Sequence, residues 1–264
     1  MFPQLIRIGS FALPTYGALV ASGFLIALLL AARLGERAGL DPDRVSSLGV
    51  YVAIAAIVGA KAFYVLGDFS YYSHNPSQLF SLGTLRAGGV FYGGLLPALA
   101  VAIWYLRRSG LPALRTADTF APALALGHAI GRVGCFAAGC CWGRPARLPW
   151  AVTFTNPVAR EIVGVPLGIP LHPTQLYEAA AELVIFFILW VRFRRPHRDG
   201  SVIGLYLLLY SAFRFAVEFW RDPTDRQFPF GGPLTIAQWT ALGLVAAGAW
   251  LLVRRRRAPL PAQS

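Results

Sequence analysis

The stretch LPTYGALVASGFLIALLLAA, residues 13–32, decides the fold class of this chain. It contains no Lys, Arg, Asp or Glu. An α-helix rises about 1.5 Å per residue, so about 20 apolar residues cross the hydrocarbon core of a bilayer. Further apolar windows of similar length follow along the chain. The sequence therefore predicts an all-α membrane protein.

Composition supports this class. The chain has 264 residues, of which 56% are apolar and 14% charged, and its mean hydropathy is +0.55. A soluble domain carries about 25% charged residues. The net charge is +12, but the arginines fall at the ends of apolar segments. This pattern indicates membrane topology, and no nucleic-acid partner is expected.

Seven spanning helices are predicted, within a single integral membrane domain over residues 1–264. The expected spans are 13–32, 46–66, 88–106, 117–138, 173–191, 201–220 and 234–253. Arginine is densest in the segments 33–44, 107–115, 192–198 and 254–257. By the positive-inside rule these segments are cytoplasmic, so the N-terminus lies outside and the C-terminus inside. Residues 143–171 are expected to form a small irregular extracytoplasmic cap, with a short strand in AVTFTN, residues 151–156.

Polar residues gather near the outer ends of six predicted spans, where burial is costly. Tyr210, Arg214 and Glu218 share one helix face, because they are spaced four residues apart. The other residues expected at this depth are Tyr16, Lys61, Tyr92, Arg132, His172, Gln175 and Glu178. One alternative is a set of unrelated helix-end residues, with Arg214 and Glu218 as a structural ion pair.

A phosphate ligand would explain this set better. Guanidinium groups offer paired donors that match phosphate oxygens, and two arginines, Arg132 and Arg214, are expected near the outer surface. Glycines accompany them and permit close approach of backbone to a ligand or to another helix. These glycines include Gly93, Gly94, Gly134, Gly139 and Gly143. The pattern favours an enzyme or carrier that handles a phospholipid headgroup.

Four motifs carry a resemblance to a known family. Residues 131–143 read GRVGCFAAGCCWG, 172–179 read HPTQLYEA, 210–228 read YSAFRFAVEFWRDPTDRQF and 234–239 read LTIAQW. In order and spacing they resemble the prolipoprotein diacylglyceryl transferase family, whose signature is G-R-[hydrophobic]-G-N-F-x-N-G-E-x-W-G. The resemblance covers nearly the whole chain.

The resemblance implies transfer of the diacylglyceryl group of phosphatidylglycerol to the thiol of a lipobox cysteine in a preprolipoprotein. It also implies a multi-pass protein of the bacterial cytoplasmic (inner) membrane that uses no cofactor. Arg132, Arg214, Glu218 and Tyr92 are the expected catalytic residues. The residues expected to bind substrate are Tyr16, Lys61, Gly93, Gly94, Gly134, Gly139, Gly143, His172, Gln175, Tyr210 and Arg221.

The chain departs from the family at several polar positions. The asparagines of the signature fall at Cys135 and Ala138, its glutamate at Cys140, and the histidine of the family's FHGG motif at Tyr92. A tyrosine hydroxyl has an unperturbed pKa near 10 and is a poor base. We therefore expect Tyr92 to act as a polarised hydroxyl in an arginine-rich pocket, with His172 as the alternative base.

The three cysteines, Cys135, Cys140 and Cys141, lie in this same motif. They are interpreted as small buried packing residues, or as partners in a Cys140–Cys141 or Cys135–Cys140 disulfide. No metal site is predicted, because the sequence has no C-x2-C spacing.

Two rival functions remain at this point. A divergent paralogue would use phosphatidylglycerol with another acceptor, which the lost polar residues favour. A lipid carrier would bind the headgroup without chemistry. A transporter should show paired halves or broken helices with a binding site near the midplane, and neither is evident.

Overall fold

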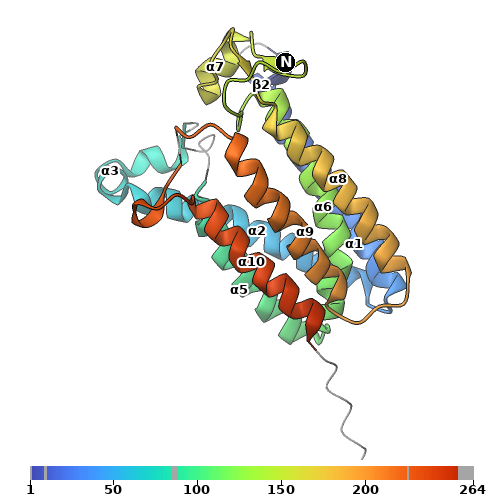
Figure 1. Ribbon diagram of the computed structural model, residues 1–264. Helices are drawn as coiled ribbons and strands as arrows, with labels where there is room; N and C mark the ends of the chain where they lie inside the picture. Colours follow the sequence, from blue (N-terminus) through green and yellow to red (C-terminus); the bar gives the residue numbers. More distant parts are fainter. Residues whose placement is uncertain (1, 9–10, 82, 85–88, 225, 255–264) are drawn as a thin grey trace, which may run out of the picture. The chain divides into compact units, whose positions relative to one another are not determined.

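The computed structural model describes residues 2–8, 11–81, 83–84, 89–224 and 226–254 (Figure 1). The chain divides into two compact units. The first comprises Met1–Ala31 with Ala117–Ser264, and the second comprises Ala32–Thr116.

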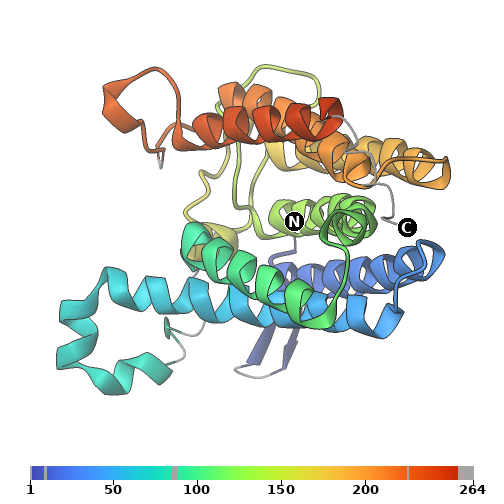
Figure 2. The ribbon, with the colours of Figure 1, turned by 90° about the horizontal axis from the view of Figure 1, so that it is seen from below.

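The first unit begins with a hairpin of two antiparallel strands, β1 (Gln4–Ile8) and β2 (Phe11–Pro14). Long helices then make up most of the unit, and Figure 2 shows α9 and α10 running side by side. They are α1 (Thr15–Arg37, up to Ala31), α6 (Ala113–Ala138, from Ala117), α8 (Thr174–Arg194), α9 (Ser201–Val217) and α10 (Ile236–Val253). Two short 3-10 turns, η2 (Glu218–Trp220) and η3 (Pro229–Gly231), lie between α9 and α10.

Glycines let these helices pack closely. A Cβ atom added at Gly23 of α1 would lie 3.0 Å from the Gly127 carbonyl oxygen of α6. At Gly248 of α10, a Cβ would lie 2.7 Å from the Gly204 carbonyl oxygen of α9. Small residues at helix contacts are typical of membrane proteins, because dispersion rather than the hydrophobic effect drives helix association in lipid.

The buried Asp118 fixes the start of α9. Its carboxylate accepts hydrogen bonds from the backbone N–H groups of Gly200 at 2.7 Å, Val202 at 3.0 Å and Ile203 at 2.8 Å. Because the first N–H groups of a helix have no partner within the helix, a carboxylate from α6 satisfies them and favours the positive end of the helix dipole.

The segment 143–171 has a small core of its own. It contains α7 (Pro157–Val163) and two short paired strands, β3 (Val152–Thr153) and β4 (Pro170–Leu171). Its buried core comprises Phe154, Ala159, Val165 and Leu171. The strand β3 falls within the AVTFTN stretch, as the sequence predicts.

The second unit is built on α2 (Pro42–Gly67) and α5 (Phe91–Ser109), with α3 (Phe69–His74) and η1 (Pro76–Phe80) between them in the chain. Gly93 and Gly94 lie at the contact between the two long helices. A Cβ at Gly93 would lie 2.3 Å from Phe63 Cβ, and one at Gly94 would lie 2.8 Å from the Ala56 carbonyl oxygen. Close helix packing therefore accounts for both glycines, and their approach to a ligand stays a prediction.

The protein is mostly helical, and the long helices coincide with the expected spans. Five helical segments in the described parts of the chain are long and apolar enough to cross a membrane: Thr15–Arg37, Pro42–Gly67, Ala113–Ala138, Ser201–Trp220 and Ile236–Val253. Two further helices, α5 and α8, cover most of the expected spans 88–106 and 173–191 without meeting that criterion. Residue 88, where the third expected span begins, lies outside the described residues.

The α2–α5 contact can be tested at Gly59. A Cβ there would lie 2.5 Å from the Gly93 carbonyl oxygen, so Gly59→Ala should destabilise the protein by about 1–3 kcal/mol through overpacking. The measurement is thermal unfolding in detergent. The matched control is Gly67→Ala in the same helix, where nothing lies within 4 Å of the added Cβ. Equal melting temperatures for the two variants would contradict this packing.

Candidate functional site

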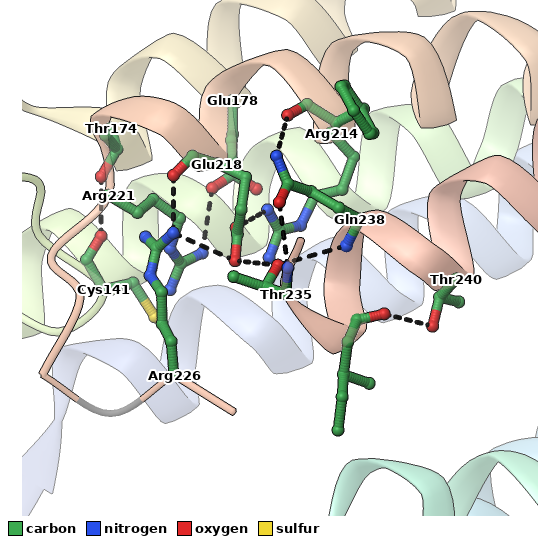
Figure 3. Close-up of polar contacts among 12 residues, drawn as sticks. Cys141, Thr174, Glu178, Arg214, Glu218, Arg221, Arg226, Thr235, Gln238 and Thr240 are labelled. Atoms are coloured by element: carbon green, nitrogen blue, oxygen red, sulfur yellow. Dashed lines mark hydrogen bonds and ion pairs between the residues drawn. The ribbon is translucent and has the colours of Figure 1, made fainter. Parts of the chain in front are cut away.

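A buried carboxylate, Glu178, joins two arginines from distant parts of the first unit, and Figure 3 shows its contact with one of them, Arg221. Its Oε2 lies 2.6 Å from Arg132 Nη2, and its Oε1 lies 3.3 Å from Arg221 Nη1. Glu178 comes from the first turns of α8, Arg132 from the last turns of α6, and Arg221 directly follows η2. The ion pairs therefore tie three elements together in a region where water is largely excluded.

A second carboxylate, Glu218, makes a parallel arrangement beside the first (Figure 3). It forms an ion pair with Arg214 one helical turn earlier, and its Oε1 lies 3.2 Å from Arg226 Nη1. Thr235 Oγ1 donates a hydrogen bond to the same carboxylate at 2.9 Å. The Arg214–Glu218 pair that the sequence left open is thus present, as part of a larger network.

Positive charge exceeds negative charge in these two ion-pair groups. Four guanidinium groups, those of Arg132, Arg214, Arg221 and Arg226, pair with two carboxylates, Glu178 and Glu218. The four arginine side chains are largely buried, with 9–19% of their surface exposed. Buried charge is costly unless it is balanced. The arrangement can therefore accept an anion with several oxygen acceptors, such as a phosphodiester.

His128 extends the network along α6. Arg132 Nε donates to His128 Nε2 at 3.2 Å, and His128 Nδ1 lies 2.7 Å from Glu182 Oε1. Because Nε2 accepts from Arg132, the proton of a neutral imidazole lies on Nδ1, the nitrogen next to Glu182. Glu182 thus orients the imidazole, and the imidazole in turn orients Arg132.

Two tyrosines of α9 line the same side of the network. Tyr210 interacts electrostatically with both Arg132 and Arg214. The rings of Tyr206 and Tyr210 stack with centroids 5.7 Å apart, and the His128 ring lies 5.5 Å from Tyr210. Tyr210 therefore links the two arginines that the sequence singles out. The expected cavity open to lipid stays a prediction.

The signature loop starts with a specific end to α6. Gly139 has φ +86°, a left-handed conformation that favours glycine. The N–H of Gly139 donates to the Phe136 carbonyl at 3.2 Å, and that of Cys140 donates to the Cys135 carbonyl at 3.1 Å. These two bonds define a Schellman motif, which reverses the chain at a helix C-terminus. Gly139 therefore has a structural role, and the turn carries Cys140 back over Cys135.

The first turn of α8 holds this loop in place. Thr174 Oγ1 donates to the Cys141 carbonyl at 2.8 Å, and Gln175 Nε2 donates to the Cys140 carbonyl at 2.6 Å. Gly143 is equally constrained, since a Cβ there would lie 2.5 Å from the Trp220 carbonyl oxygen. The signature motif, HPTQLYE and the end of α9 are thus joined through backbone contacts.

The three cysteines form one cluster. Their Sγ atoms all lie within 4.8 Å of one another, and all three are free thiols. Hydrogen bonds from Cys135 and Cys140, and then the guanidinium groups of Arg221 and Arg132, lower the pKa of the Cys141 thiol. Tyr16 of α1 also interacts electrostatically with each of the three cysteines. The cluster lies beside the arginine network rather than in an isolated apolar core.

His172 lies at the edge of this region. Its Nδ1 is 3.2 Å from the Tyr177 hydroxyl, which also accepts a hydrogen bond from Trp150 Nε1 at 2.8 Å. Burial lowers the pKa of His172 from its usual value, so the neutral form is favoured at neutral pH.

The first unit brings together many of the residues expected from the sequence. Arg132, Arg214, Glu218, Tyr210 and Arg221 belong to the two ion-pair groups or contact them. Gly134 packs against α1, with an added Cβ 3.3 Å from Leu19 Cβ. The expected residues Lys61, Tyr92, Gly93 and Gly94 belong to the second unit. There Lys61 Nζ donates to the Thr84 carbonyl at 2.8 Å. The roles assigned to these four residues stay predictions.

Three residues of the network were not expected from the sequence: His128, Glu182 and Arg226. Glu178 was expected at the depth of the polar residues but was given no role. Helical spacing offered a signal for two of the three. His128 precedes Arg132 by one turn, and Glu182 follows Glu178 by one turn, so each pair shares a helix face. Nothing in the sequence identified their partners on other helices.

The family model of the prolipoprotein diacylglyceryl transferases matches residues 3–254. Three relatives named phosphatidylglycerol–prolipoprotein diacylglyceryl transferase are similar to the chain. The protein of Vibrio atlanticus (strain LGP32) is 36% identical over 95% of this chain and 89% of its own length. The protein of Nitratidesulfovibrio vulgaris (strain DP4) is 38% identical over 95% of this chain and 93% of its own length. That of Clostridium tetani (strain Massachusetts / E88) is 35% identical over 84% of this chain and 87% of its own length.

The central carboxylate can be tested by its removal. Glu178→Gln leaves Arg132 and Arg221 without their anionic partner, and breaking a buried pair in this way costs about 3–5 kcal/mol. We expect a lower free energy of unfolding in detergent, measured by thermal or denaturant unfolding. The control Glu161→Gln changes an exposed carboxylate in α7 and should stay within about 0.5 kcal/mol of the unsubstituted protein. A Glu178→Gln variant as stable as this control would show that the ion pairs contribute little.

Proposed function

The chain belongs to the prolipoprotein diacylglyceryl transferase family, and we propose that it transfers the diacylglyceryl group of phosphatidylglycerol to the lipobox cysteine of a preprolipoprotein. The thiol of that cysteine gives up its proton to a base, and the sulfur forms a thioether bond to the terminal glyceryl carbon. The carbon–oxygen bond to the phosphate breaks, and glycerol phosphate leaves with the electron pair.

The excess of buried guanidinium groups carries this proposal. Phosphatidylglycerol has a single phosphodiester charge, and negative charge grows on the leaving phosphate as the carbon–oxygen bond breaks. Donors fixed in advance near the developing charge lower the barrier, because they need no reorganisation during the reaction. Arg132 and Arg214 are the proposed phosphate ligands, and Tyr210 interacts electrostatically with both.

Glu178 and Glu218 are the proposed positioning residues. Each one holds two guanidinium groups, so each arginine can share its donors between a carboxylate and the phosphate. Arginine suits this double role since its five N–H donors lie in one plane. Glu218, expected from the sequence to be catalytic, therefore acts through Arg214.

The proposed setting is the bacterial cytoplasmic membrane. Seven spans, with the N-terminus outside and the C-terminus in the cytoplasm, agree with the arginine-rich segments 33–44, 107–115, 192–198 and 254–257. In this orientation the ends of α6 and α9 that carry Arg132 and Arg214 face outward, and residues 143–171 form the extracytoplasmic cap. The proposed reaction requires the lipobox of the precursor to reach that same side.

A second candidate function is transfer of the same lipid group to another acceptor. The cysteines at positions 135 and 140 and the tyrosine at position 92 favour it, since they replace polar residues of the family pattern. Complementation of a bacterial strain depleted of its own transferase distinguishes the candidates. Growth, with diacylglyceryl-modified lipoprotein detected by mass spectrometry, supports the proposed acceptor. A paralogue or a lipid carrier would give no rescue.

The phosphate ligands can be tested directly. Arg132→Ala and Arg214→Ala should each lower the rate of diacylglyceryl transfer to a lipobox peptide by roughly 10²–10³-fold, because a charge-assisted contact to the phosphate is lost. Arg→Lys at either position should also fail, since lysine cannot donate two parallel hydrogen bonds. Arg160→Ala, at an exposed position in α7, is the control. Full transfer by both alanine variants would make these arginines purely structural.

The role of Tyr92 can be tested by removing one atom. Tyr92→Phe retains the ring and loses the hydroxyl, so turnover should fall strongly while expression and melting temperature stay unchanged. Tyr92→His should retain or raise turnover, because an imidazole is a better base than a phenol at neutral pH. The measurement is the transfer rate under substrate saturation. Undiminished turnover of Tyr92→Phe would exclude Tyr92 as the proton acceptor and leave His172 or the substrate phosphate.

A further inference from the structure

We propose that Cys135, Cys140 and Cys141 bind one Zn²⁺ ion through three thiolates and that the open fourth position takes the acceptor thiol. This inference rests on the proposed function for the identity of that thiol. The metal site itself rests on the geometry of the cluster alone.

The sulfur positions fit a single ion. Zn–S bonds are about 2.3 Å long, so three sulfurs around a tetrahedral Zn²⁺ lie roughly 3.8 Å apart. The three Sγ atoms lie within 4.8 Å of one another, so they need to approach by about 1 Å at most. A disulfide would use two of the sulfurs and leave the third without a role. A metal ion uses all three.

The backbone conformation after α6 brings the three thiols together. The Schellman turn at Gly139 returns Cys140 to Cys135, and Cys140 Sγ lies 3.7 Å from the Cys135 carbonyl oxygen. Cys141 has φ +62°, the one non-glycine residue with positive φ in the described ranges. Such a conformation costs energy for a residue with a Cβ and is found where the surroundings enforce it. Here the Thr174 hydroxyl and the Gln175 amide hold the carbonyl groups of Cys141 and Cys140.

The surrounding charge also fits. Three thiolates and one Zn²⁺ carry a net charge of −1, which a buried site must balance. Arg132 interacts electrostatically with Cys135 and Cys141, and Arg221 interacts with Cys141. The same guanidinium groups are the excess positive charge of the phosphate network. One cluster of cations therefore serves both a thiolate–metal centre and the leaving phosphate.

The chemistry matches the departures from the family pattern. A thiol bound to a metal ion is deprotonated outright, so its activation needs no strong base. Zinc sites with three protein ligands keep a fourth position for water or substrate. In this chain tyrosine occupies the position of the family's histidine, and the cysteines occupy positions of its polar signature. The metal would thus promote deprotonation of the acceptor thiol, the role that a histidine base is expected to have elsewhere in the family.

The resulting step is balanced without any redox partner. The acceptor thiol replaces water at the fourth position, and its proton passes through that water to the base of the proposed function. The thiolate sulfur then attacks the terminal glyceryl carbon of the lipid, and the bond from this carbon to the phosphate oxygen breaks. The phosphate leaves with the electron pair, and zinc remains Zn²⁺ throughout.

Metal binding can be measured on the full-length protein, purified in detergent with an affinity tag that contains no histidine. We expect about one zinc ion per chain by elemental mass spectrometry. Cobalt-loaded protein should show thiolate-to-cobalt charge-transfer bands and the visible bands of tetrahedral Co²⁺. Each single Cys→Ser substitution should weaken Zn²⁺ binding by more than the roughly 10–100-fold that an outer-shell change costs. The control His74→Gln, at an exposed position in α3, should leave it unchanged.

Several results would overturn the metal site. One is wild-type protein that contains no zinc and takes up no cobalt. Another is an unchanged affinity for Zn²⁺ in the Cys→Ser variants. A third is one free thiol, rather than three, in the unreduced, denatured protein, which would indicate a disulfide. Removal of metal from the wild-type chain with a chelator, followed by return of Zn²⁺, tests the site without any substitution. If the protein instead bound copper with three sulfur ligands in a trigonal geometry, no fourth position would remain for the acceptor thiol, and that part of the proposal would be wrong.

A lipobox peptide separates this inference from the proposed function. Its cysteine should increase the thiolate-to-cobalt absorbance, and the matched serine peptide should not. Transfer that depends on zinc and is lost in Cys140→Ser supports both proposals. Zinc-loaded protein that binds the peptide thiol but transfers nothing would contradict the proposed function and leave the metal site standing. Full transfer by the triple Cys→Ser variant would overturn the role of the metal and leave the proposed function standing.

Discussion

The structure of the site depends on one buried carboxylate, Glu178. Its two oxygens pair with Arg132 from α6 and with Arg221, which directly follows η2. Two guanidinium groups next to each other in an apolar environment repel each other and lose their hydration, so neither could remain buried without an anion. A bridging carboxylate solves this problem for the resting protein. The two guanidinium groups still have N–H donors that can form hydrogen bonds to a phosphate.

This constraint explains why several backbone features lie where they do. The Schellman turn at Gly139, the absence of a side chain at Gly143 and the hydrogen bonds from Thr174 and Gln175 all fix the loop that follows Arg132. Glu178 follows Thr174 and Gln175 on the same helix. The elements that carry the ion pairs are thus the elements that position the cysteines, and any shift of α8 against α6 would disturb both.

The two ion-pair groups also show how one set of charges can have structural and chemical roles. Burying an ion pair seldom adds much stability, because desolvation offsets the attraction between the charges. The free energy lost by desolvating two carboxylates and four guanidinium groups therefore offsets most of what their pairing contributes to helix packing. The proposed function gives a reason to retain them, since a bound anionic headgroup would balance the excess positive charge.

The sequence by itself determined the helical membrane class and the approximate position of each long helix, and it singled out arginines that the structure brings into two neighbouring ion-pair groups. Hydropathy over about 20 residues is a local property, and the motifs around Arg132, Gln175 and Arg214 lie in continuous stretches of the chain. The expected spans 13–32 and 234–253 coincide with α1 and α10 for this reason. The tertiary structure alone decided that Glu178 pairs with Arg132 and Arg221, that Glu182 orients His128, and that Cys135, Cys140 and Cys141 converge beside the arginines. A sequence pattern specifies which face of a helix a side chain occupies, but the partner across the interface depends on how helices far apart in the chain pack together.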